Sequence, residues 1–133
     1  MSRVVYLERK SFVQYDDQHV MVYLNEELVP DYVPEVMEGQ QAPEPATGYS
    51  YEGTMPDGGT LIEASSVDRD SMINGIIRSR YSQSEEDAIK THQILLLKDP
   101  LIDKAIDYES EWAAFDGFRE FAKSVVDGWL ESA

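Results

Sequence analysis

The stretch that decides the fold is Tyr108–Trp129, YESEWAAFDGFREFAKSVVDGW. Its apolar residues recur at steps of three or four, a spacing that places them along one side of an α-helix. The stretch therefore predicts one long amphipathic helix against which other segments pack. The residues of this apolar stripe are Tyr108, Trp112, Phe115, Phe118, Ala122, Val125 and Trp129.

The stripe is wider than one neighbouring helix needs. Phe121 and Val126 lie beside it and add apolar surface. Either two helices and a sheet pack on this side, or a second copy of the protein does. Core packing and an interface with a partner both stay open for the aromatic rings. The candidate interface residues are Trp112, Phe115, Phe118, Phe121, Val125 and Trp129.

Two further helices are indicated before this one. The first has a buried side at Met72–Ile77, with capping candidates at Ser65, Ser66 and Asp68. The second begins at Ser82–Glu85, a capping box in which serine and glutamate each satisfy a backbone N–H at the helix start. We expect its apolar side to hold Ala88, Ile89, His92, Leu95 and Leu96.

Asp99-Pro100 ends the second helix and is expected to open the last one, with Asp99 as N-cap and Pro100 in the first position. Four acidic residues then recur every four positions. Because like charges at this spacing repel, we expect them to face solvent. They are Asp99, Asp103, Asp107 and Glu111.

The N-terminal side of the sequence predicts short antiparallel strands. Runs rich in β-branched and aromatic residues occur at 4–7, 12–15 and 19–24, with a turn at Asp16–Gln18. Residues 49–53 and 60–64 predict a further hairpin around Met55–Gly59, whose Pro-Asp-Gly-Gly sequence is typical of a tight turn.

These elements predict an α+β protein, with short antiparallel β hairpins or a meander on the N-terminal side. A three-helix C-terminal part with a long last helix follows. Residues 1–30 form the β hairpin or meander unit, and 31–48 form a linker or arm rich in proline, glycine and glutamate. Residues 49–133 form a β hairpin plus helical domain.

The net charge of the chain indicates which partners it is not expected to bind. The chain has 26 acidic and 11 basic residues, a formal net charge of −15, with no basic stripe. A nucleic-acid backbone or an anionic membrane would be repelled, so we expect neither as a partner. There is no cysteine, no run long enough to span a bilayer and no signal peptide, so we expect a cytoplasmic protein.

Signatures of catalysis are missing from the sequence. His19 and His92 are the side chains best suited to proton transfer near neutral pH. A helical metal site would place a carboxylate three or four positions before His92, where Ile89 and Ala88 stand. We therefore expect packed histidines, with no catalytic residue, no cofactor and no metal.

Five segments carry a resemblance: Gly48–Gly53, Asp57–Ile62, Ile76–Ser82, Glu86–Ile89 and Glu111–Lys123. Together they resemble small uncharacterised proteins encoded in phages and prophages of gut bacteria. The resemblance covers about residues 31–130, and it implies a phage accessory or virion-associated protein. It implies no activity and no catalytic residues.

The function expected from these observations is a non-enzymatic protein-interaction or assembly module, derived from a phage or prophage. It would act in the host cytoplasm or on the virion, by self-association or with a protein partner. One alternative is an acidic mimic or inhibitor that binds a basic surface of a host protein. Another is a small-ligand binder or an enzyme without a recognisable motif.

Overall fold

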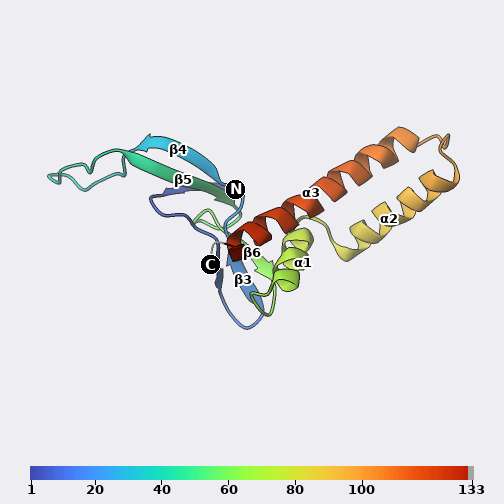
Figure 1. The fold of residues 1–133 in the computed structure, drawn as a ribbon, viewed down its shortest axis with the longest axis horizontal. Helices are drawn as coiled ribbons and strands as arrows, with labels where there is room; N and C mark the ends of the chain where they lie inside the picture. Colours follow the sequence, from blue (N-terminus) through green and yellow to red (C-terminus); the bar gives the residue numbers. More distant parts are fainter. Residues whose placement is uncertain (132–133) are drawn as a thin grey trace. The chain divides into compact units, whose positions relative to one another are not determined.

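The computed structural model describes residues 1–131 and has an α+β fold, with six strands followed by three helices (Figure 1). The predicted class and its long last helix are therefore confirmed. The chain forms two compact units, residues 1–61 and a second unit that begins at Ile62. This division lies after the segment 31–48 that the sequence marked as a linker or arm.

The first sheet joins strands that are far apart in the sequence. Its order is β1 (Ser2–Tyr6), β5 (Ala46–Gly53) and β4 (Glu27–Tyr32), and both pairings are antiparallel. In the centre, Val4 lies opposite Tyr51. At the edge, β4 contains Pro30 and has an irregular register between Val29 and Tyr32. Proline donates no hydrogen bond, so an edge strand is where it is tolerated.

The second sheet has the order β2 (Phe12–Gln14), β3 (His19–Val22) and β6 (Thr60–Glu63). The predicted β2–β3 hairpin is confirmed, with Phe12 opposite Val22. The predicted hairpin of residues 49–53 and 60–64 is wrong, because β5 and β6 belong to different sheets.

The turn between β5 and β6 forms as expected, although it does not join paired strands. The amide of Met55 donates to the carbonyl of Gly59 at 2.9 Å, and Gly58 has a φ of 83°. A Cβ atom on Gly53 would lie 2.2 Å from the carbonyl oxygen of Gly59. Any side chain at position 53 would therefore clash with the backbone of the turn.

The segment predicted as a linker or arm lies between two neighbouring strands. Residues 33–45 contain neither helix nor strand, and nearly all of them are exposed. They connect β4 to β5, which pair side by side. Loops of this length in compact proteins often have a binding role or act as flexible connections.

Three helices follow: α1 (Arg69–Arg80), α2 (Gln83–Lys98) and α3 (Ala105–Glu131). Asp68 is the N-cap of α1, and its side chain accepts from the amide of Ser71. The expectation that Asp99 opens α3 is wrong, because Asp99 is the C-cap of α2. Its carboxylate accepts from the amide of Leu101, and two successive turns carry the chain to Ala105.

Helix α3 packs against both α1 and α2. Its fully buried residues are Phe115, Ala122 and Val126, so the core side of α3 includes Val126 where the sequence pattern placed Val125. On α1 the predicted buried side is confirmed by Met72, Ile73, Ile76 and Ile77. The helical core therefore centres on the middle and the end of α3.

The capping box at the start of α2 is present as predicted. The hydroxyl of Ser82 accepts from the amide of Glu85 at 3.1 Å, and the carboxylate of Glu85 accepts from the amide of Ser82 at 3.3 Å.

Replacing Ser82 by alanine should lower the free energy of unfolding by about 1 kcal/mol, because the amide of Glu85 loses the hydroxyl that accepts its hydrogen bond. Urea denaturation followed by circular dichroism measures this loss. Ser84→Ala, in the first turn of α2 without a capping role, is the matched control. Equal stability of Ser82→Ala and the parent protein would contradict the cap.

Candidate interaction surface

Part of the aromatic side of α3 is packed inside the helical unit. Phe115 is 1% exposed, and its ring meets Tyr81 edge-on, with centroids 5.2 Å apart. Phe118 lies 5.9 Å from Tyr81, and the guanidinium carbon of Arg80 lies 5.0 Å from the Phe118 ring centroid. Edge-on pairs and cation–π contacts of this kind are favourable in addition to burial.

The six candidate interface residues therefore differ in their surroundings. Phe115 belongs to the core, whereas Phe121 is 37% exposed and stacks on Phe118 at 5.9 Å. The others lie at the margin of the core. These half-buried side chains are Trp112, Phe118, Val125 and Trp129. The stripe as a whole offers less free apolar surface than the sequence pattern indicates.

Several more exposed apolar side chains lie where α2 turns into α3. We name this group the hairpin end and define it as Ile94, Leu95, Leu97, Leu101 and Ile106. Leu101 is 90% exposed, Ile106 79% and Leu97 72%. Exposed apolar residues that gather in one short segment mark contact sites more often than single exposed leucines do. In Figure 1 this segment is the turn that joins the two longest helices.

The hairpin end was not predicted, although the sequence contains a signal for it. Residues 94–97 read Ile-Leu-Leu-Leu, and four consecutive residues of a helix point in directions about 100° apart. Only Leu96 among them is fully buried. The other three side chains had to lie toward the margin or the outside of the helix.

The charge around the hairpin end differs from the rest of the chain. Residues 94–106 contain two lysines and two aspartates, so the segment has no net charge, whereas the whole chain carries −15. The order is Lys98-Asp99 before the turn and Asp103-Lys104 after it, and all four are exposed. This segment is therefore the part of the hairpin that an acidic partner would approach with least repulsion.

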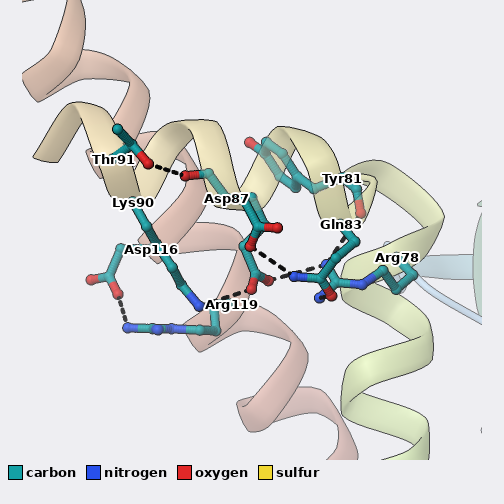
Figure 2. A network of polar contacts seen from close by, with 9 residues as sticks. Arg78, Tyr81, Gln83, Asp87, Lys90, Thr91, Asp116 and Arg119 are labelled. Atoms are coloured by element: carbon teal, nitrogen blue, oxygen red, sulfur yellow. Dashed lines mark hydrogen bonds and ion pairs between the residues drawn. The ribbon is translucent and has the colours of Figure 1, made fainter.

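A polar network holds α1 to α2 (Figure 2). Glu86 accepts from Lys90 at 2.8 Å and from Arg78 at 3.1 Å, while Arg78 also donates to Gln83 at 2.7 Å. The hydrogen bond from Lys90, together with that from Arg78, holds the pKa of Glu86 below its usual value. Glu86 is buried and fully paired, which indicates a structural role.

His92 has partners that sequence spacing did not show. Its Nδ1 lies 2.9 Å from a carboxylate oxygen of Glu111, and its ring stacks on Tyr108 with centroids 4.3 Å apart. Both partners come from α3. Glu111 is therefore half-buried, and the expectation that it faces solvent with the other three acidic residues is wrong. His19 instead pairs with Asp16 in the β2–β3 turn, at 2.9 Å.

Three tyrosines form a cluster in the first unit. Tyr51 is buried and donates to Glu26 at 2.6 Å, and Tyr23 donates to Asp57 at 2.9 Å. Tyr6 lies 6.1 Å from Tyr23 and 6.2 Å from Tyr51, measured between ring centroids. Burial raises the pKa of Tyr23 to about 12 and also raises that of Tyr51. Tyr51 is therefore part of the core of the first unit, with its hydroxyl bonded to Glu26.

Comparisons with protein-family models, curated proteins and solved structures found no match for this chain. Within residues 1–131, no group of three or more histidine and carboxylate side chains is placed to hold a metal ion. In the same part of the chain, no helix combines the length and the apolar character that crossing a bilayer requires.

Proposed function

We propose that this protein is a non-enzymatic protein-interaction or assembly module that makes contact through the hairpin end. The single observation that supports it is the exposure of five large apolar side chains between Ile94 and Ile106. In water this exposure is unfavourable, and a protein surface that covers these side chains removes it.

The free energy gained by covering these side chains is comparable to the cost of association. Full burial of a leucine or isoleucine side chain stabilises by about 1.5–3 kcal/mol. The five side chains are 41–90% exposed, so covering them on one copy supplies roughly 5–10 kcal/mol. Association itself costs about 4–15 kcal/mol in lost freedom. A contact that covers the hairpin ends of both copies supplies roughly 10–20 kcal/mol, which offsets most of this range, whereas one that covers two or three side chains of one copy reaches only its lower part.

The partner that best fits this surface is a second copy of the chain. Two copies that each carry −15 repel one another over most of their surface. The hairpin end has no net charge, so two copies can meet there without this repulsion. A two-fold contact places the same patch on both copies, so the apolar side chains of one hairpin end cover those of the other.

We predict that the double variant Leu97→Asp/Leu101→Asp is monomeric where the parent protein forms dimers. Both side chains are largely exposed, so the substitutions leave the fold intact and add charge only to the contact. Sedimentation equilibrium over a range of concentrations measures the change, and circular dichroism verifies the fold.

Leu28→Asp is the matched control, because Leu28 is 65% exposed but lies on β4 outside the hairpin end. This variant should dimerise like the parent protein. A parent protein that stays monomeric at its highest soluble concentration contradicts self-association. Dimers that survive the double substitution contradict the hairpin end as the contact.

The setting of this module is part of the proposal. A phage accessory or virion-associated role rests on the sequence resemblance of segments such as Ile76–Ser82 and Glu111–Lys123. The net charge of −15 supports protein rather than nucleic acid as the partner, because a phosphate backbone carries charge of the same sign.

A further inference from the structure

A hollow of about 360 Å³ lies between α1 and α3, away from the hairpin end. Ile73 and Ile77 of α1 form its apolar part, and both are buried. Three cationic side chains also line it: Arg69 of α1 with Arg119 and Lys123 of α3. The volume lies within the range of small-molecule sites, about 300–1,000 Å³.

The two helices run antiparallel past this hollow. Arg69, at the start of α1, bonds Asp127 near the end of α3 with an N–O distance of 2.6 Å. Lys123 and Arg119 follow one and two turns earlier on the same side of α3, since residues four apart in a helix are neighbours. At a rise of about 1.5 Å per residue, the Cα atoms of these two residues are roughly 6 Å apart along the helix axis.

The cations have acidic partners that a ligand could displace. Arg119 donates to Asp116 at 2.6 Å and Lys123 to Glu120 at 3.4 Å, and all four side chains are partly or largely exposed to water. Exposed ion pairs of this kind contribute about 0–1 kcal/mol each. The buried Nε–H of Arg119 has no hydrogen-bond partner among the described residues. A buried donor without a partner is unfavourable by about 1–3 kcal/mol.

The charges also indicate the orientation of a ligand. Asp70 lines the end of the hollow near Arg69, where Asp127 also lies, so that end carries two carboxylates against one guanidinium. At the opposite end two cations, Arg119 and Lys123, stand against two carboxylates, Asp116 and Glu120, so that end has no excess negative charge. An anionic group is therefore favoured at the Arg119–Lys123 end, with its apolar body over Ile73 and Ile77.

We propose that this hollow is a binding site for a small organic anion with an apolar body. A single carboxylate, sulfonate or phosphate group would bond Arg119 and Lys123, while the hydrocarbon part covers Ile73 and Ile77. Inorganic phosphate lacks the apolar part and a neutral hydrocarbon lacks the charge, so each should bind much more weakly. The site is independent of the hairpin end and of self-association.

The test uses the fluorescence of 8-anilinonaphthalene-1-sulfonate, which has an aromatic body and one sulfonate. Titration of the full chain should give saturable binding, and the neutral analogue N-phenyl-1-naphthylamine should bind at least about fivefold more weakly. Octanoate should displace the dye, whereas inorganic phosphate at equal concentration should not. Each hydrogen bond to a charged group is worth about 1.5 kcal/mol or more, or roughly tenfold in affinity.

Two substitutions test whether the dye binds in the hollow between α1 and α3. Lys123→Gln and Arg119→Gln should each weaken dye binding about five- to tenfold. Arg3→Gln is the matched control, because it removes the same charge from an exposed position on β1, outside both the hollow and the hairpin end, and it should bind like the parent protein. Thermal melts confirm that each variant is folded.

Two results would overturn the proposal. One is dye affinity unchanged in folded Lys123→Gln and Arg119→Gln. The other is loss of dye binding in the Leu97→Asp/Leu101→Asp variant, because the dye would then report the exposed apolar hairpin end. Because Arg119 also contacts the rings of Trp112 and Phe115, Lys123→Gln decides the result if Arg119→Gln does not fold.

Discussion

Replacing Phe115 by alanine should lower the free energy of unfolding of the helical unit by about 3–5 kcal/mol, the usual cost of truncating a buried phenylalanine. The ring is 1% exposed and has aromatic neighbours on both sides, Tyr81 at 5.2 Å and Trp112 at 6.0 Å. Alanine leaves a cavity where α3 meets the end of α1. A unit of this length is stable by roughly 4–10 kcal/mol, so most of its stability would be lost.

Chemical denaturation followed by helical circular dichroism measures this loss. Phe121→Ala is the control, because Phe121 lies on the same helix but is 37% exposed, and it should cost less than half as much. Equal losses for the two variants would show that the core of the unit does not centre on Phe115.

Replacing Gly75 by valine should also destabilise the helical unit, by about 3 kcal/mol. A Cβ atom at this position would lie 2.9 Å from the carbonyl oxygen of Glu63 and 2.9 Å from Cδ1 of Ile62. The helix and β6 must separate to admit the side chain, and overpacking of this kind costs about 1–3 kcal/mol or more. Valine regains less than about 1 kcal/mol of helix propensity over glycine, so the clash exceeds the gain.

Gly117→Val is the matched control for this prediction. Gly117 lies in the interior of α3, and a Cβ atom there would meet no atom within 4 Å. The same substitution should leave stability unchanged or raise it by a few tenths of a kcal/mol through helix propensity. Urea midpoints of the two variants compare them directly. If both variants were as stable as the parent protein, α1 would not approach β6 closely.

The features that the sequence predicted are those encoded by neighbouring residues. The Ser82–Glu85 capping box and the buried side of Met72–Ile77 arise within single helical turns, and both are present. The turn at Met55–Gly59 is likewise local. Strand pairing is different, because β5 pairs with β1 across more than forty residues. The Met55–Gly59 turn favoured pairing of β5 with β6, which is close in sequence. In the folded protein β5 pairs with β1 and β4 instead, because the packing of the whole sheet determines the partners.

The candidate interaction residues show the same difference between features that are local in sequence and contacts between distant segments. The stripe on α3 located Phe115 correctly as a large apolar residue but could not show that Tyr81 and Arg80 cover its neighbour Phe118. The His92–Glu111 contact joins two helices, so no spacing within one helix reveals it. The hairpin end was missed because Asp99-Pro100 was interpreted as a helix start. With α3 beginning at Ala105, the intervening residues form a turn that leaves Leu101 in solvent.

The irregular outer strand β4 has a consequence for how the protein avoids aggregation. A flat, regular edge strand recruits further strands and can seed fibrils. Here Pro30 removes one donor, and Asp31 adopts a left-handed φ of 54° beside the register shift. An incoming strand would find neither a continuous row of donors nor a straight backbone. Uncontrolled stacking of strands through this edge is therefore blocked, even at the high local concentrations of a newly synthesised protein.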